Sequence, residues 1–312
     1  MRSILVLATL CIFPLCARMH VYTNHLSDKE LREQLDSAHI KFHKAKKMFN
    51  PWYSGPLLAG SAHILPPGAI NTQPYLFFTT NYGSYTARRH HKKEDNTFIL
   101  NPENVLQIGI LPKLQFTLVN SAVYQTQNGI HSGGYGDTQI SLGLEIFKEE
   151  AYLPAIAFYV AESFPTGKFE RGNGSKSGLD LTGNGAFVTS VQVTSSKVVW
   201  WVFEHPMQIR LNFTSDIYSS KIPVKGINAY GGYHDTKGTV TKGNTMQWNF
   251  SYEGSITQNW VVAVDVVYEY NNNSTFKGMA GVDSNGMEAV VGNASSDVLS
   301  IAPAIEYNID EN

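Results

Sequence analysis

Charged and polar side chains recur at alternate positions of several apolar segments, and together they could line a water-filled path. The alternation assigns one polar set to a common face: Glu145, Tyr159, Glu162, Arg210, Glu253, Asp265, Glu269 and Glu306. A ring of charges of this kind selects solutes by their sign. Acidic residues outnumber the arginine in this set, so we expect it to disfavour anions. The alternative is a network of ion pairs that only stiffens the fold.

Arg210, Glu253 and Asp265 fall on three consecutive segments of this pattern. Arg210 and Glu253 each lie about four residues from a short turn, or ~13 Å at the rise of a β-strand. This matched height predicts that the guanidinium and the carboxylate form a pair on one wall.

Other residues of the types used in catalysis or metal binding lie in no motif that supports such a role. Residues 88–93, RRHHKK, form a charged loop tip that could contact anionic lipopolysaccharide. Two adjacent histidines without further ligands do not define a metal site. His131, His205 and His234 lie in no recognisable nucleophile motif. Glycine-rich phosphate loops and cysteine clusters are also missing, so we expect no catalytic residues, no bound metal and no cofactor.

The polar set must be positioned by β-strands, because apolar and polar residues alternate with a period of two. In residues 260–271, for example, Trp260, Val264 and Tyr268 fall on one face and Asp265 and Glu269 on the other. Ten strands are expected, at residues 74–82, 105–111, 114–126, 137–147, 153–164, 183–195, 207–217, 245–256, 260–271 and 297–309. Several of them have ~11 residues, the length that crosses a bilayer when tilted.

The connections between these strands alternate strictly between long and short. Outer-membrane barrels show this alternation, with short periplasmic turns and long outer loops, whereas a soluble sandwich has no reason to show it. Charged residues make up 16% of the chain, well below the about 25% of soluble proteins. The formal net charge of -2 gives no indication of nucleic acid as a partner. The pattern predicts an all-β fold, a transmembrane antiparallel up-and-down barrel.

The residues before the first strand are of a different kind. Residues 1–17 have the positive start and short apolar run of a signal peptide, and both cysteines, Cys11 and Cys16, lie inside it. Residues 18–73 contain one amphipathic helix, at 27–49, and a connector rich in proline and glycine. Ser27 and Glu30 form a capping box for the helix. The helix either packs on the domain or plugs the barrel that residues 74–312 form.

Five segments resemble a known family when they are taken in order. They are PWYSGPLLAGSAHILPPGAINTQPYLFF from Pro51, GDTQISLGLEIF with its PTGKF exit, KGINAYGGYH from Lys225, SITQNWVVAVDVVYEY from Ser255 and SSDVLSIAPAIEYN from Ser295. They are similar to segments of the bacterial outer-membrane proteins grouped as meta-pathway phenol degradation transporters. The resemblance covers residue 50 to the end and implies a barrel of about twelve strands that passes small, often hydrophobic compounds.

The chain departs from this family at its end. Family members continue through two further strands and finish on an aromatic residue, whereas this chain stops at Ile309-Asp310-Glu311-Asn312. An open strand edge in lipid leaves backbone groups unsatisfied. We therefore expect the barrel to lack its last two strands, and residues 297–309 not to pair fully with residues 74–82.

These observations together predict a passive channel or uptake protein for small, hydrophobic or aromatic solutes in the Gram-negative outer membrane. Its expected partners are outer-membrane lipid, lipopolysaccharide and the solute. A structural or surface-interaction barrel with a filled lumen is the alternative, and an outer-membrane hydrolase is the third possibility. An open path through the barrel would favour the channel, and a lumen filled by side chains would favour the structural barrel.

Overall fold

A computed structural model describes residues 27–48, 58–200, 206–219 and 221–309 of the chain. The predicted signal peptide and Trp201 lie outside the described residues. Helix α1 (Asp28–Met48) belongs to one compact unit, and the strands belong to another. The predicted capping box is present, because the Ser27 N–H donates to Glu30 Oε2 at 2.8 Å and the Glu30 N–H donates to Ser27 Oγ at 3.3 Å. Whether the helix plugs the barrel stays a prediction.

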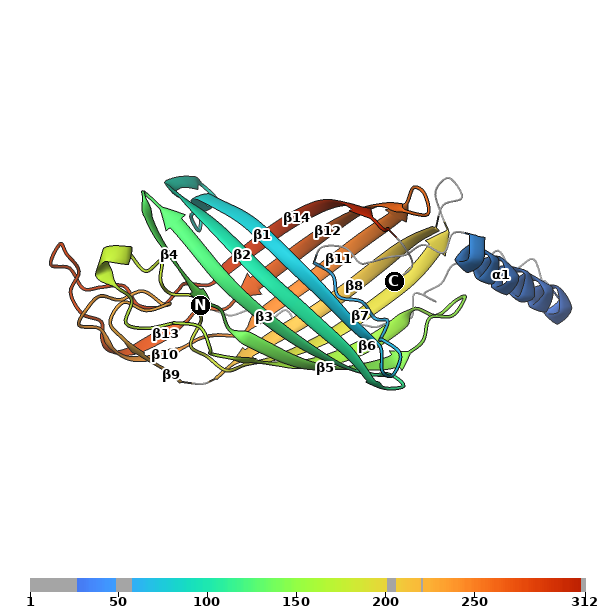
Figure 1. Cartoon of the computed structure of the whole chain (residues 1–312), viewed down its shortest axis with the longest axis horizontal. Coiled ribbons are helices and arrows are strands. Elements are labelled where there is room, and N and C mark those ends of the chain that lie inside the picture. The colour runs from blue at the N-terminus through green and yellow to red at the C-terminus, as the bar shows by residue number, and fades with distance from the viewer. Residues whose placement is uncertain (1–26, 49–57, 201–205, 220, 310–312) are drawn as a thin grey trace, which may run out of the picture. The chain divides into compact units, whose positions relative to one another are not determined.

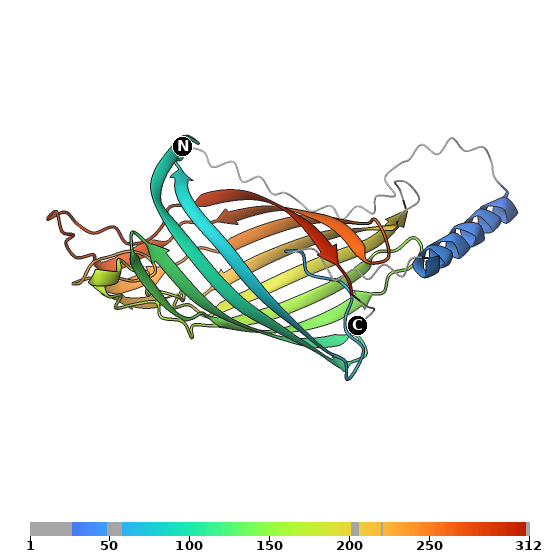
Figure 2. The ribbon, with the colours of Figure 1, turned by 45° about the horizontal axis from the view of Figure 1, so that its top comes forward.

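Ten strands form one curled antiparallel sheet, in which each strand neighbours the next long strand of the chain (Figures 1 and 2). The order is β1 (Ile70–Tyr85), β2 (His91–Leu111), β3 (Leu114–Gln127), β5 (Thr138–Phe147), β6 (Ala155–Phe164), β7 (Val188–Trp200), β8 (Pro206–Tyr218), β11 (Thr245–Ser255), β12 (Trp260–Asn271) and β14 (Ser296–Tyr307). The predicted up-and-down topology and all ten predicted strands are therefore present.

Strand β2 begins 14 residues earlier than expected, at His91 rather than at residue 105. The first connection is consequently a long hairpin with the charged run 88–93 near its tip. Pairing between β2 and β3 skips Asn101 and Pro102. Proline has no N–H to give to the ladder, and the Asn101 side chain donates to the Ala122 carbonyl instead, at 2.7 Å. This substitute bond carries the strand past the proline.

Three more of the expected loops are also partly strands. The segments β9 (Ile222–Lys225), β10 (Lys237–Thr241) and β13 (Thr275–Met279) form a separate sheet in the order β13-β10-β9. Its core consists of Ala186, Val188, Ile222, Val224, Tyr230 and Val240. A further strand, β4 (Ile130–Tyr135), pairs with β3, and η1 (Gly174–Lys176) is a single turn. The long-loop end is thus a packed structure of its own.

The two faces of the ten-stranded sheet differ in polarity as predicted. On β12, Val262 and Tyr268 are 36% and 40% exposed on the outer face, whereas Asp265 on the inner face is fully buried. Aromatic side chains continue across the outer face, where the Trp248 ring lies 5.4 Å from that of Phe213 and 5.8 Å from that of Tyr268. The sheet therefore presents apolar side chains outward and polar side chains inward.

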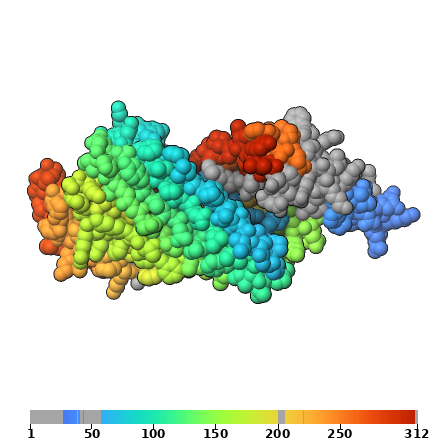
Figure 3. Space-filling model, in the orientation of Figure 1, coloured from blue at the N-terminus to red at the C-terminus, as the bar shows by residue number. Residues whose placement is uncertain are grey.

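The sheet ends on two strands that do not pair with each other. Among the described residues, β1 pairs only with β2 and β14 pairs only with β12. The open seam expected between these strands is confirmed, and β1 and β14 are both visible on one face in Figure 3. Each carries a proline, Pro74 or Pro303. Proline is found at sheet edges because it cannot donate to a ladder.

The capping box makes the stability of α1 depend on pH. The bonds from the Ser27 N–H and then from its hydroxyl hold the pKa of Glu30 below its ordinary value. The stabilisation is therefore complete above that ordinary pKa of about 4.3 and is lost as the pH falls through the lowered value. We expect a peptide of residues 18–48 to lose helicity in circular dichroism over this range.

The substitution Glu30→Gln should remove that part of the acid transition, whereas Glu33→Gln should leave it in place. Identical acid transitions in the two peptides would contradict the role of Glu30.

Candidate functional site

The inner face of the curled sheet is crossed by an extended segment, residues 58–69, which we call the inner connector. It follows the predicted proline- and glycine-rich stretch and leads directly into β1. Its hydrogen bonds begin at β12 and end at β2, so the segment runs from one side of the sheet to the other. The sequence predicts an irregular connection here but not its place against the inner wall.

The first bonds of the inner connector go to β12 and β8. The Leu58 N–H donates to Asp265 Oδ2 at 3.0 Å. Arg210 Nη1 donates to the Ala59 carbonyl at 3.4 Å, and Asn212 Nδ2 donates to the Gly60 carbonyl at 3.3 Å. An extended chain away from water needs partners for its backbone groups. Polar side chains of the wall supply these partners.

The middle of the inner connector lies against β6 and β7. Tyr159 Oη donates to the Ser61 carbonyl at 2.7 Å. The Ala62 N–H donates to Ser196 Oγ at 3.2 Å, and Ala62 packs in a small buried cluster with Ala155 and Ala157. Small side chains on both sides allow this close approach.

Glycines let the inner connector and its tyrosine partner lie flat on the wall. A Cβ on Gly109 of β2 would lie 2.0 Å from the Pro66 carbonyl oxygen, so only glycine admits the backbone there. The Gly68 N–H donates to the Gly109 carbonyl at 2.8 Å, and the Leu65 N–H donates to Gln115 at 3.1 Å. A Cβ on Gly143 would lie 2.3 Å from the Tyr159 ring. These two positions tolerate no side chain without movement.

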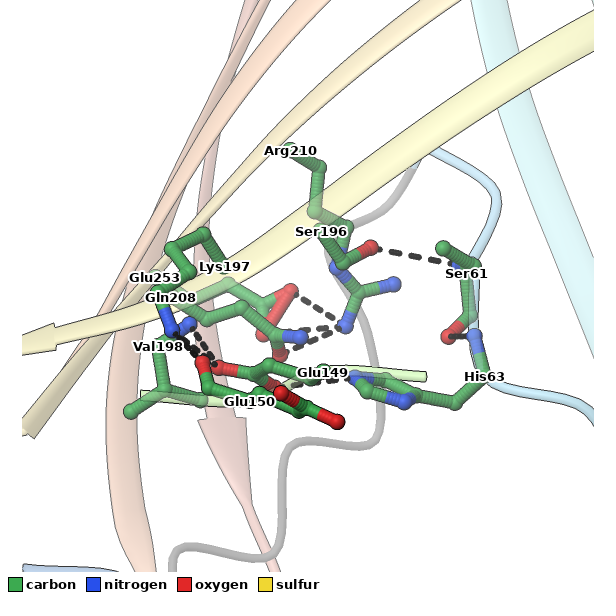
Figure 4. A network of polar contacts seen from close by, with 11 residues as sticks. Ser61, His63, Glu149, Glu150, Ser196, Lys197, Val198, Gln208, Arg210 and Glu253 are labelled. Carbon is green, nitrogen blue, oxygen red and sulfur yellow. Dashed lines mark hydrogen bonds and ion pairs between the residues drawn. The ribbon is translucent and has the colours of Figure 1, made fainter. Parts of the chain in front are cut away.

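Arg210, which bonds to the inner connector, also forms a buried ion pair, as Figure 4 shows. Arg210 Nη2 lies 2.8 Å from Glu253 Oε1, and their side chains are 3% and 0% exposed. The same nitrogen donates to Gln208 at 3.1 Å. The pairing of Arg210 with Glu253 predicted from their height is confirmed. The guanidinium thus joins β8, β11 and the inner connector.

A second charged group holds the inner connector at the short turn between β5 and β6. Glu149 Oε2 lies 3.5 Å from His63 Nε2, and its Oε1 lies 3.4 Å from Lys197 Nζ. The Val198 N–H also donates to Oε1, at 2.7 Å (Figure 4). Short turns mark one end of the sheet, so these contacts place the inner connector near that end.

Most of the predicted inward residues lie on the inner face. Glu145 is 9% exposed there, and Glu269 accepts bonds from Gln247 at 3.3 Å and Asn271 at 2.7 Å. The prediction for Glu162 is wrong. Glu162 lies three positions after Tyr159, and side chains alternate in a strand, so the two residues lie on opposite faces.

Glu162 pairs with Ile140 of β5, an outward residue, and accepts a bond from the Thr189 hydroxyl at 2.7 Å. It therefore lies on the outer face close to the long-loop end of β6.

Sequence reasoning did not single out several residues that contact the inner connector: Gln115, Glu149, Ser196 and Asn212. Most are uncharged, and their alternation with apolar neighbours was the only available signal. Gln115, Ser196 and Asn212 bond to the backbone of the inner connector, which has no side-chain pattern that would reveal it.

The described part of the chain contains no group of three or more histidine, cysteine, aspartate or glutamate residues that could hold a metal ion. No helix within residues 27–48, 58–200, 206–219 and 221–309 has both the length and the apolar character to cross a membrane.

Comparison with known proteins identifies the fold. No family model matches the chain, and no curated protein matches it. The structure is similar to the crystal structure of an outer membrane channel from Pseudomonas putida F1, with a TM-score of 0.56 and 12% sequence identity. The match covers 80% of this chain and 99% of that one. The chain thus has the fold of an antiparallel outer-membrane barrel, with a sheet that is open between β1 and β14.

The buried ion pair predicts a coupling that can be measured. The change Arg210→Met leaves Glu253 buried without its cation, which should destabilise the fold by about 3–5 kcal/mol. The double change Arg210→Met with Glu253→Met should recover much of this loss, because no unpaired charge remains. Urea unfolding in detergent micelles, followed by tryptophan fluorescence, measures both values.

A double variant as unstable as Arg210→Met alone would contradict this account of the pair. It would show that the contacts of Arg210 with Gln208 and the Ala59 carbonyl matter more than its pairing with Glu253.

Proposed function

We propose that the protein is an outer-membrane channel for the passive uptake of small molecules. One observation carries the proposal: the curled sheet is apolar outside and charged inside, the reverse of a soluble β-protein. Such a wall fits lipid on one side and water on the other. The fold shared with an outer membrane channel supports the same assignment.

The inner connector acts in this proposal as a constriction at the periplasmic end. Short turns are periplasmic in outer-membrane barrels, and the contact between His63 and Glu149 lies beside one of them. A solute that entered between the long loops would meet this segment last. The connector narrows the exit without any need for the helix to enter the barrel.

The inner charges set the selectivity that we propose. Glu145, Asp265 and Glu269 are acidic, whereas the positive charge of Arg210 is already matched by Glu253. Rings of acidic side chains favour cations. Neutral or cationic solutes therefore pass more easily than anions. The specific solutes of the phenol degradation family, small hydrophobic or aromatic molecules, are proposed from the sequence resemblance alone.

The further parts of the proposal concern location and partners. The chain is exported by its N-terminal signal and inserted into the Gram-negative outer membrane, in contact with lipid and lipopolysaccharide. We assign it no reaction and no cofactor.

A structural barrel with a filled interior is the second candidate. The observation that favours it is the number of inner side chains already engaged with the inner connector, among them Asp265, Tyr159 and Ser196. A barrel of this kind would conduct no ions, so one measurement separates the two candidates.

Conductance across a planar lipid bilayer tests the channel. The refolded chain should give discrete current steps with a reversal potential that favours cations. The paired changes Tyr159→Phe and Ser196→Ala remove two hydrogen bonds to the inner connector. They should increase the step size or its fluctuation, because the constriction is held less firmly. Tyr268→Phe, on the outer face of β12, is the matched control and should leave the current unchanged.

Folded protein that produces no steps would favour the structural barrel instead. Folding is verified by the difference in gel migration between heated and unheated samples.

The membrane location has a separate test at Val264, which lies on the outer face of β12. Val264→Arg should cost about 2–4 kcal/mol of stability in lipid, because the charge faces the middle of the bilayer. Ala302→Arg is the control, since Ala302 lies on the inner face directly opposite Asp265. Unfolding in lipid vesicles measures both, and equal losses would contradict the assignment of the faces.

A further inference from the structure

A surface cavity of about 420 Å³ lies at the long-loop end, between the small three-stranded sheet and the loop that contains η1. Its charged lining comes from Arg171, Lys225, Lys237, His234 and Asp235. Three of these side chains are permanent cations and one is a carboxylate. The cavity is distinct from the inner face and takes no part in the channel proposed above.

Two of the cations are opposed directly. Lys225 of β9 and Lys237 of β10 are partners in the antiparallel register. Side chains at such positions lie on the same face, about 4.5–5.5 Å apart at Cβ, and like charges there are destabilising. Neither lysine has an ion pair within 4.0 Å among the residues that the structure describes. This pair of charges costs stability unless an anion lies between them.

The third cation is brought to the same place by the backbone. The Arg171 N–H donates to the Lys225 carbonyl at 2.9 Å, and the Gly172 N–H donates to the Ile227 carbonyl at 2.7 Å. Arg171 has a φ of +55°, which places it in the left-handed region. Its Nε lies 3.6 Å from Glu170 Oε1. That contact uses one of the five N–H donors of the guanidinium and leaves its terminal nitrogens available.

The carboxylate in the lining is directed to the backbone of a neighbouring loop. Asp235 Oδ1 accepts the Val282 N–H at 3.2 Å, and the same oxygen lies against Gly281, where a Cβ would come within 2.2 Å. The Gly226 N–H donates to the Thr236 carbonyl at 2.8 Å and fixes the turn between the lysines. Asp235 therefore has a structural partner, and the net formal charge of the lining is about +2 by the usual ionisation states.

We propose that this cavity is a binding site for a phosphate group. A phosphate monoester carries about -1.5 to -2 charges at neutral pH, which matches the lining. Arginine and lysine bind its oxygens through charge-assisted hydrogen bonds. A ligand with a single carboxylate would neutralise the charge of only one of the two opposed lysines. The phosphate belongs either to a small solute that collects at the outer mouth or to lipopolysaccharide beside the loops.

Calorimetric titration of the refolded chain with inorganic phosphate, at constant ionic strength in chloride, tests the site. Binding should be saturable. The double change Lys225→Gln with Lys237→Gln should weaken it at least about tenfold, the effect of losing one hydrogen bond to a charged group. Lys277→Gln is the matched control, because Lys277 is exposed on β13 of the same sheet, opposite Thr239, and does not line the cavity.

Thermal unfolding gives a second readout that a merely structural role would not produce. Without phosphate, the double variant should be more stable than the parent chain, because the opposed charges are gone. With phosphate, the parent chain should gain stability and the double variant should not. Equal responses of the two proteins to phosphate would overturn the proposal.

A third arm identifies the source of the phosphate. Vesicles with lipopolysaccharide and vesicles with its dephosphorylated form are compared for binding to the parent chain and to the double variant. A preference for the phosphorylated lipid that the double variant loses assigns the site to lipopolysaccharide. Saturable binding of inorganic phosphate without that preference assigns it to a soluble phosphate. The absence of both effects refutes the site.

Discussion

The structure depends on how the backbone of the inner connector is satisfied on the concave face of the sheet. Ala59 and Ala62 of this segment are buried, and peptide groups that water does not reach need partners. Side chains from β12 and β8, then from β6 and β7, and then from β3 provide these partners. The inner connector therefore needs the polar side chains of the inner wall as partners, and those side chains in turn need its backbone groups.

The bonds of the inner connector also restrain the shape of the sheet, because the sheet has open edges. A closed barrel is held in shape by its continuous ladder, whereas a sheet open between β1 and β14 lacks that restraint. The inner connector links β12 with β2 across the concave side, from Leu58 to Gly68. It thus connects two strands near the open edges and helps to maintain the curvature of the sheet.

Local periodicity predicted the features that depend on neighbouring residues. The faces of β11 and β12 follow from strict alternation, and the pair of Arg210 and Glu253 follows from their similar distance to the short turns. The predicted inward orientation of Glu162 is wrong because Glu162 and Tyr159 are an odd number of positions apart in β6, so their side chains lie on opposite faces. The early start of β2 was missed because the bond from Asn101 that carries the strand past Pro102 cannot be seen in a linear pattern.

The features that could not be predicted depend on residues far apart in the chain. Strands β9, β10 and β13 have four or five residues each, too few for a period to be recognised, and β10 pairs with β13 more than 30 residues away. The partners of the inner connector lie between 40 and 207 residues further along the sequence. A segment with several distant partners carries no local signal of any of them.

The position of the inner connector in the chain also fixes the order of assembly. It precedes β1, yet its bond to Asp265 joins residues that are 207 positions apart. That bond cannot form until β12 is in place, and loop closure over such a distance is slow. The segment that precedes every strand of the sheet in the chain is therefore among the last parts of the domain to be secured, and until then the concave face stays open to water.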